Sequence, residues 1–324
     1  MKCPKCNKEV SHDWKLCPFC GFEPKKCSNP GCQPRWLPQE AKFCPECGRP
    51  IMGNNIATAT NDRCFQYDSQ SITNDVVDKM PECFTIKEGV DFVFTIKGVS
   101  FKMVFVKGGI FQMGATSEQG LSFGFDFLDA RKPTHTVVLS DYYLGESVVT
   151  RELWNNVTGG NPLKANEVNF PKDQISWFDC DVFIRKLNQI TGKMFRLPTE
   201  SEWEYAARGG TNSLYLYRYA GDNDIDAVAW YEKNSNDKIH PVMTKKPNKL
   251  GLYDMSGNVH EWCSDWHGKY SSQQQTNPQG PLSGRWRICR GGCFGSLAVR
   301  CEVAVRDSFP PEFEGPGFRL ALSV

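Results

Sequence analysis

The residues best suited to chemistry in this sequence are cysteines, and most of them stand near its amino-terminal end. Eight of the 15 cysteines lie within the first 47 residues, and their spacing divides them into two sets of four. The first set is Cys3, Cys6, Cys17 and Cys20, and the second is Cys27, Cys32, Cys44 and Cys47. A C-x2-C turn holds two sulfurs on one side of a tight knuckle, and two knuckles complete the tetrahedral thiolate shell of a structural zinc site. The sequence therefore predicts two zinc ions, with rubredoxin-type iron as the alternative.

Metal binding would also explain how so short a segment folds. Residues 1–50 contain few large apolar side chains for a core, whereas metal binding contributes about 10–16 kcal/mol per site in comparable peptides. The pattern resembles the tandem zinc ribbons of bacterial proteins, which implies a structural or protein-docking module. Nucleic-acid binding is the alternative, because basic residues outnumber acidic ones here. The polar residues 51–81 are predicted to be a linker.

The composition indicates a globular protein with many loops. The chain is 40% hydrophobic and 23% charged, with 28 Gly, 20 Pro and a net charge of +1. Near-neutrality argues against a chain-wide electrostatic attraction to nucleic acids or membranes. The seven remaining cysteines are scattered, which predicts free thiols. No apolar run reaches the roughly 18 residues of a spanning helix, and the first cysteine pair leaves no room for a signal peptide, so we expect a cytoplasmic protein.

Residues 82–324 are predicted to form one α+β domain with a loop-dominated half. Alternating apolar residues predict paired strands over 88–106 with a turn at Lys97–Gly98, and further strands over 135–139 and 300–305. Helices are predicted to begin after the capping residues Thr150, Ser176 and Thr199. The second helix is expected to bury an apolar face made of Phe178, Val182, Phe183, Leu187 and Ile190.

The last forty residues divide into a frame and a filling. Arg290-Gly291-Gly292 stands at one end and Gly317-Phe318-Arg319-Leu320 at the other. Between them, residues 293–316 mix aromatic, charged, small and aliphatic side chains without a sustained period. The frame is predicted to belong to the scaffold, and the filling to form a surface.

Six phrases, in order from Phe101 to Leu320, carry a resemblance to the formylglycine-generating enzyme, or sulfatase-modifying factor, family. They are FKMVFVKGGIFQMG, PTHTVVLSDYYLGESVVTRELW, FRLPTESEWEYAARGG, VAWYEKNS, KPNKLGLYDMSGNVHEWCSDW, and RGG with GFRL. The resemblance implies a loop-rich C-type lectin-like fold. Residues 251–266 would then be a scaffold segment with Trp262 and Trp266 in the core, and His260 stands where the family usually has Trp.

Two enzymatic branches of the family make demands that this sequence does not meet. The oxidases bind copper through two cysteines with four residues between them, whereas Cys293 and Cys301 here have seven between them. We therefore expect no copper, although Cys293 paired with Cys301 or Cys289 stays open as an alternative catalytic pair. The iron-dependent sulfoxide synthases need a His-x3-His-x-Glu set that none of the five histidines matches. His260-Glu261 with His267 is the only partial candidate.

A structural calcium ion is a further expectation, since loop-rich relatives use oxygen ligands to hold loops. The candidate ligands are Asn248, Asp254, Asn258 and Glu261. Ordinary turn and hydrogen-bonding roles are the alternative for each of them.

The filling resembles the variable region of target proteins of diversity-generating retroelements, which lies between an RGG and a terminal GFRL. The resemblance implies a non-catalytic protein that binds a protein or another macromolecule through exchangeable side chains. The candidate binding residues are Phe294, Gly295, Ser296, Leu297, Val299, Arg300, Val303, Val305, Asp307, Ser308, Phe309, Glu312, Phe313 and Glu314. The alternatives are a formylglycine-generating-type oxidase, a degenerate enzyme loop, and a zinc-ribbon interaction module whose large domain is only a scaffold.

Overall fold

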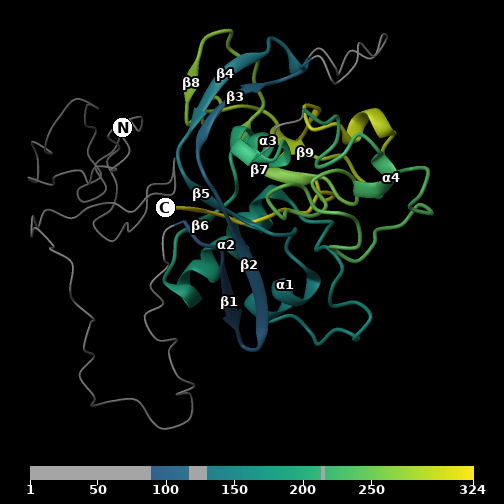
Figure 1. Ribbon diagram of the computed structural model, residues 1–324. Coiled ribbons are helices and arrows are strands. Elements are labelled where there is room, and N and C mark those ends of the chain that lie inside the picture. Colours follow the sequence, from purple (N-terminus) through teal and green to yellow (C-terminus); the bar gives the residue numbers. More distant parts are fainter. Residues whose placement is uncertain (1–88, 117–129, 213–215) are drawn as a thin grey trace, which may run out of the picture. The chain divides into compact units, whose positions relative to one another are not determined.

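The computed structural model describes residues 89–116, 130–212 and 216–324 (Figure 1). The chain divides after Met80, and the described residues belong to the unit Pro81–Val324. Both predicted zinc sites and the predicted linker lie outside the described residues. No helix among the described residues is long and apolar enough to cross a membrane.

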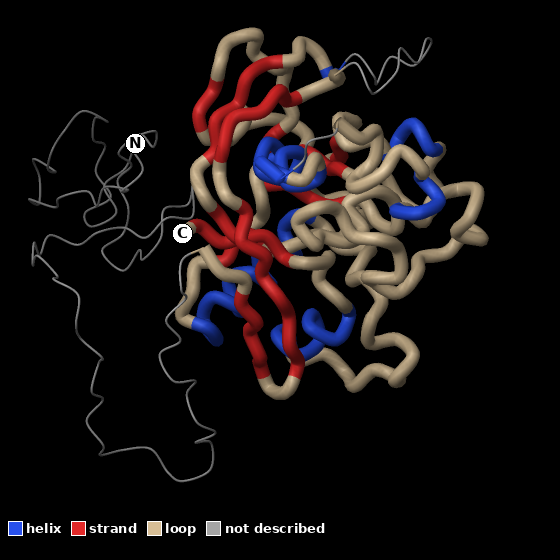
Figure 2. The backbone as a smooth tube through the Cα atoms, in the orientation of Figure 1, coloured by secondary structure: helices blue, strands red, loops and turns tan. Residues whose placement is uncertain are grey.

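A five-stranded antiparallel sheet runs through the domain in the order β1-β2-β5-β11-β6 (Figure 2). The predicted hairpin is confirmed, because β1 and β2 pair across a turn in which Lys97 and Gly98 both have positive φ. The strand that ends the chain, β11, pairs with both β5 and β6. The strands are β1 Phe92–Ile96, β2 Val99–Val106, β5 Tyr142–Gly145, β6 Phe195–Arg196 and β11 Ala321–Ser323.

Two smaller sheets complete the strands of the described residues. One has the order β3-β4-β8, in which β4 confirms the strand predicted over 135–139. The other has the order β10-β9-β7, and its strand β9 ends at Arg290, the first residue of the frame. Their bounds are β3 Gly109–Met113, β4 His135–Leu139, β8 Gln275–Thr276, β7 Glu261–Trp266, β9 Arg287–Arg290 and β10 Arg306–Phe309.

The three predicted helix starts are confirmed by their capping hydrogen bonds. The Thr150 side chain accepts from the backbone of Leu153, and Ser176 and Thr199 each form a capping box. The helices are α1 Arg151–Thr158, α2 Trp177–Thr191, α3 Glu200–Ala207 and the short α4 Ile225–Val228, with single 3-10 turns η3 Gly210–Asn212 and η4 Ala298–Cys301.

The predicted apolar face of α2 is only partly right. Phe183 and Leu187 are fully buried, but Phe178, Val182 and Ile190 are 52%, 44% and 39% exposed. The buried stripe consists of Cys180, Phe183, Ile184 and Leu187. These positions follow the i, i+3, i+4, i+7 spacing of one helix face, so the face that packs on the core shares Phe183 and Leu187 with the predicted face but is rotated away from its other three residues.

The carboxyl-terminal frame is part of the core. Phe318 is fully buried against Phe183 of α2, with the ring centroids 5.4 Å apart in an edge-to-face arrangement. Trp262 is fully buried as expected, whereas Trp266 is only partly buried and lies 3.6 Å from the Arg287 guanidinium. The frame therefore fixes both ends of the filling, residues 293–316.

Candidate functional site

Helix α3 lies at the centre of a network of buried ion pairs. Its three glutamates lie at alternate positions 200, 202 and 204, and each forms an ion pair with an arginine outside the helix. Arg306 of β10 approaches Glu200 at 2.6 Å, and Arg196 of β6 approaches Glu202 at 2.7 Å. Burial raises the pKa of the Glu200 carboxyl, but Arg306 and Arg290 outweigh burial and lower it. The Glu200 carboxylate is thus held ionised inside the domain.

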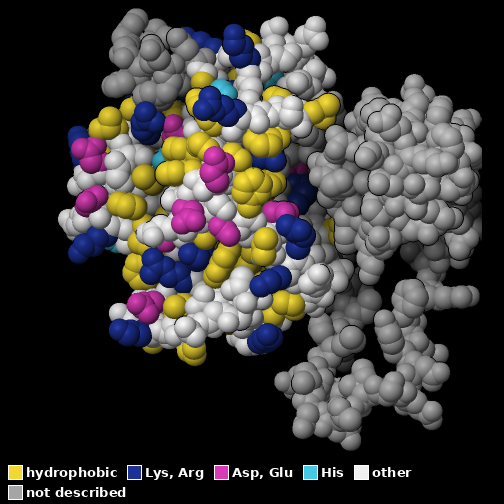
Figure 3. All heavy atoms as spheres, turned by 180° about the vertical axis from the view of Figure 1, so that it is seen from behind, with side chains coloured by type: hydrophobic (Ala, Val, Ile, Leu, Met, Phe, Trp, Pro, Cys, Tyr) yellow, Lys and Arg dark blue, Asp and Glu magenta, His cyan; other side chains and the backbone are white. Residues whose placement is uncertain are grey.

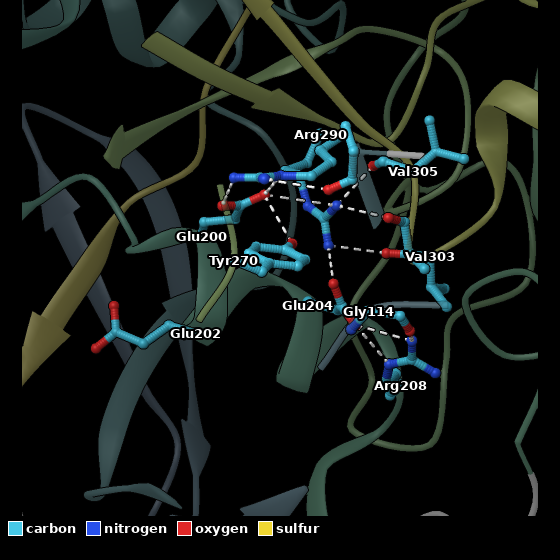
Figure 4. A network of polar contacts seen from close by, with 12 residues as sticks. Gly114, Glu200, Glu202, Glu204, Arg208, Tyr270, Arg290, Val303 and Val305 are labelled. Carbon is cyan, nitrogen blue, oxygen red and sulfur yellow. Dashed lines mark hydrogen bonds and ion pairs between the residues drawn. The ribbon is translucent and has the colours of Figure 1, made fainter. Parts of the chain in front are cut away.

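Arg290, the first residue of the frame, connects α3 to the filling (Figure 4). Its guanidinium is fully buried, pairs with Glu204, and donates hydrogen bonds to the backbone carbonyls of Val303, Ala304 and Val305 at 3.0, 3.1 and 2.7 Å. One side chain therefore satisfies three consecutive carbonyls that have no strand partner.

The segment 301–305 is accordingly a buried part of the scaffold, and the strand predicted over 300–305 is wrong. After η4 the chain enters the interior. There the Arg290 guanidinium donates to backbone carbonyls the hydrogen bonds that the N–H groups of a neighbouring strand would otherwise donate. Val303 and Val305 are each 1% exposed, so these two predicted binding residues are corrected to core residues. Glu302 is also buried and pairs with Arg131 at 2.8 Å.

The second end of the frame is held in the same way. Arg319 is fully buried and forms a bidentate pair with Glu261 of β7, with both contacts at 2.6 Å. It also donates to the carbonyls of Gly145 and Tyr253 at 3.0 and 2.9 Å. The indole nitrogen of Trp203 donates to Glu261 at 2.8 Å. Both ends of the filling are therefore anchored by buried arginines.

Two stretches of the filling remain at the surface, residues 294–300 and 307–314, which we call the C-terminal surface. Of the predicted binding residues in them, only Ser296 is buried, at 6% exposure, because its hydroxyl accepts from the backbone of Cys293. Gly295, Leu297, Glu312, Phe313 and Glu314 are exposed, and Phe294, Val299, Arg300, Asp307, Ser308 and Phe309 are partly exposed.

Contacts between side chains join the two stretches. Arg300 donates to Asp307 at 2.8 Å, which links the first stretch to the second. Within the second, the rings of Phe309 and Phe313 stack with centroids 4.7 Å apart. His260, which the sequence placed in the scaffold, lies edge-to-face with Phe309 at 5.7 Å. The surface thus has an aromatic group beside an ion pair.

The residues considered for metal binding have protein partners. The four residues predicted as calcium ligands are all buried: Asn248, Asp254, Asn258 and Glu261. Asn258, for example, accepts from the backbone of His240 at 3.0 Å, and Glu261 pairs with Arg319. Among the described residues, no three His, Cys, Asp or Glu side chains group to hold a metal, so His260, Glu261 and His267 do not assemble an iron site. Calcium stays a prediction.

Residues 97–324 match the model of the sulfatase-modifying factor enzyme 1-like domain. The chain belongs to this family.

Relatives within and around the family differ in their described roles. The chaperone protein LppX of Paenibacillus barcinonensis is 31% identical over 277 residues, covering 69% of this chain and 90% of LppX. The formylglycine-generating enzyme of Streptomyces coelicolor is 36% identical over 189 residues, covering 52% of this chain and 57% of the enzyme. Among solved structures, Treponema denticola variable protein 1 is 31% identical with a TM-score of 0.64, covering 72% of this chain and 99% of that protein.

The cysteines considered as a Cu(I) pair differ in burial. Cys301 is fully buried beneath the Gly291-Gly292 turn, and burial raises the pKa of its thiol. Cys289 is fully buried as well, with its pKa raised for the same reason. Cys293 is partly exposed. The absence of copper stays a prediction, and Cys293 with Cys301 or Cys289 stays the alternative catalytic pair.

Sequence reasoning missed several residues of the site. The Arg290 contacts with three carbonyls and the Arg131–Glu302 pair join residues that are far apart in the chain. In the sequence, the one signal of a buried ion-pair network was the group of glutamates in ESEWE, together with several arginines to which no role had been assigned.

Proposed function

We propose that this chain is a non-catalytic ligand-binding protein whose C-terminal surface contacts a protein or another macromolecule. The observation that carries the proposal is the separation of roles within the last forty residues. Arg290 and Arg319 anchor the backbone from inside, while Leu297, Phe313 and the charged residues 312 and 314 are exposed on that anchored backbone. Such a surface can exchange side chains at little cost to the fold.

The charge of the chain favours a protein ligand over nucleic acid. The net charge is +1, and the face in Figure 3 intersperses basic, acidic and hydrophobic side chains without a broad area of one sign. Nucleic-acid binding draws on a concentrated basic area. The aromatic pair Phe309–Phe313 and the Arg300–Asp307 pair instead provide the mixture that protein interfaces use.

The finer proposal is that the C-terminal surface is the diversified region of a retroelement target protein. The similarity to Treponema denticola variable protein 1 supports it. The test is to sequence the DNA flanking the gene. We expect a near-copy of the codons for the C-terminal surface beside a reverse-transcriptase gene, with template adenines opposite codons 294–300 and 307–314. Codons 302–306 should match, since those side chains are buried. Absence of the repeat would rule out the retroelement role.

The oxidase alternative is tested on the same protein. The 36% identity with a formylglycine-generating enzyme keeps it in view. The purified chain is incubated with copper, oxygen and a cysteine-containing sulfatase peptide, and the peptide is analysed by mass spectrometry. Formation of formylglycine that is lost in Cys293→Ala or Cys301→Ala would contradict the non-catalytic proposal. An unchanged peptide is the expected result.

Residues 1–50, for their part, are proposed to bind two zinc ions and to dock a protein partner in the cytoplasm. We expect metal analysis of the purified chain to find two zinc ions per chain, and Cys3→Ser with Cys27→Ser to remove both, because each variant breaks one four-thiolate set. Residues 1–50 expressed alone should unfold on chelation. Iron in place of zinc, or stoichiometry unchanged by the substitutions, would contradict the proposal.

A further inference from the structure

Cys293 differs from the other cysteines of the described residues. Cys180, Cys263, Cys289 and Cys301 are fully buried, whereas Cys293 is partly exposed at the beginning of the C-terminal surface, beside the exposed Gly295. It directly follows Gly291 and Gly292, whose positive φ values of 91° and 71° turn the chain sharply after β9. Of the described cysteines, Cys293 is thus the one that is partly exposed.

Hydrogen bonds hold the Cys293 loop in place. The Cys293 backbone donates to the Ser296 hydroxyl at 2.9 Å, and the Cys293 sulfur lies 3.4 Å from the same hydroxyl. The Phe294 backbone donates to the carbonyl of Asn258 at 2.9 Å, which ties the loop to the segment containing His260. The thiol is thereby fixed next to an imidazole.

His260 lies between the Cys293 thiol and a carboxylate. The charges of its ring and of the thiol influence each other's pKa values, and its Nδ1 lies 3.8 Å from Oδ2 of Asp307. That Nδ1 is buried and makes no hydrogen bond. The other oxygen of Asp307 accepts from Arg300 at 2.8 Å, which orients the carboxylate. A thiol, an imidazole and a carboxylate therefore stand in sequence at the edge of the C-terminal surface.

We propose that Cys293 is a nucleophilic thiolate, paired with a His260 imidazolium that Asp307 orients, and that it reacts with soft carbon electrophiles reaching the C-terminal surface. The thiol proton passes to His260, and the sulfur lone pair forms a bond to the electrophilic carbon while the bond to the leaving group breaks. With an α-halo amide the halide departs with its electron pair, so no oxidant or reductant is needed. The site shares Arg300 and Asp307 with the C-terminal surface, but its test does not require that the surface binds a ligand.

The electrostatics agree with this geometry. Burial alone would raise the pKa of Cys293, but the hydrogen bond and charge of His260, the Ser296 hydroxyl and the Gly295 backbone lower it from 9.0 to about 7. Burial would lower the pKa of His260, but Cys293 and Asp307 outweigh burial and raise it, while Arg300 opposes them. Both shifts have the sign expected for a thiolate–imidazolium pair, in contrast to the four buried thiols, whose pKa values burial raises.

The test is the pH dependence of alkylation in the full-length, metal-loaded chain. Iodoacetamide is added at pH values from 5 to 10, the reaction is quenched, and tryptic peptides are quantified by mass spectrometry. Cys293 lies alone in the peptide 291–300, whereas Cys289 and Cys301 fall in the neighbouring peptides. We expect the 291–300 peptide to be alkylated at least about tenfold faster at pH 7 than either neighbour, with a midpoint near pH 7, since alkylation rises as the thiol loses its proton.

His260→Gln separates the pair from a merely exposed thiol. Without the imidazolium the midpoint should rise toward about 8.5, and the rate at pH 7 should fall about three- to tenfold, because the gain in intrinsic nucleophilicity partly offsets the loss of thiolate. Asp307→Asn should shift the midpoint in the same direction by less. His267→Gln, a histidine outside the site, is the matched control and should leave both values unchanged. A native midpoint above 8, or one that neither His260→Gln nor Asp307→Asn moves, would overturn the proposal.

Discussion

Replacing Arg290 with methionine is expected to lower the free energy of unfolding by about 3–5 kcal/mol. The guanidinium is fully buried, so its loss leaves the carbonyls of Val303, Ala304 and Val305 without partners inside the domain. Each unsatisfied buried carbonyl costs about 1–3 kcal/mol. Glu204 retains Arg208 at 2.8 Å, which limits the electrostatic part of the loss. Urea unfolding followed by circular dichroism measures the change.

Two controls separate this network from a general effect of substitution. Glu312→Ala with Glu314→Ala alters two exposed residues of the same forty-residue stretch and should change the stability by less than about 0.5 kcal/mol each. Arg185→Met removes an exposed ion pair with Asp181 and should cost at most about 1 kcal/mol. If Arg290→Met were as mild as these controls, residues 301–305 could not depend on Arg290 for their buried position.

Arg319→Met is expected to destabilise the domain by a similar amount, about 3–5 kcal/mol, by a different route. Arg319 is the bidentate partner of Glu261, and both side chains are fully buried. Its removal leaves Glu261 with the Trp203 indole but without a countercharge. It also frees the carbonyls of Gly145 and Tyr253, which connect β5 and the loop before β7 to the end of the chain.

A double-mutant cycle identifies the charge as the cause. Glu261→Gln in the Arg319→Met background removes the uncompensated carboxylate but keeps an acceptor for Trp203, so the double variant should be more stable than Arg319→Met alone. The coupling energy should be on the order of 1–3 kcal/mol. Strictly additive losses would show that packing, rather than the ion pair, makes Arg319 necessary.

The two arginines explain how the domain can combine a constant interior with an exchangeable exterior. Neither depends on which side chains stand at the exposed positions 295, 297, 312, 313 and 314, because their partners are α3, β7 and backbone carbonyls. Backbone carbonyls are present whatever the side chain is. The scaffold therefore supports the proposed binding role whichever side chains occupy these five positions.

The sequence by itself predicted the features that neighbouring residues control. Helix starts at Thr150, Ser176 and Thr199 follow from capping within three residues, and the hairpin at Lys97–Gly98 follows from alternation and a turn that tolerates positive φ. The ordered phrases identified the family, which the match over residues 97–324 confirms. The frame at Arg290 and Gly317–Leu320 was also predicted to belong to the scaffold, and both ends are buried.

Only the tertiary structure decided which residues between the ends of the frame face outward. Cys301, Val303 and Val305 alternate with Arg300, Glu302 and Ala304, which is the pattern of a strand. Residues 301–305 are nevertheless buried, because Arg290, and not another strand, donates hydrogen bonds to their backbone carbonyls. The face of α2 and the approach of His260 to Cys293 were decided in the same way, by contacts between residues distant in the chain. Capping and turn preferences act over a few residues, whereas buried ion pairs and packing act across the whole domain, so a local pattern cannot encode them.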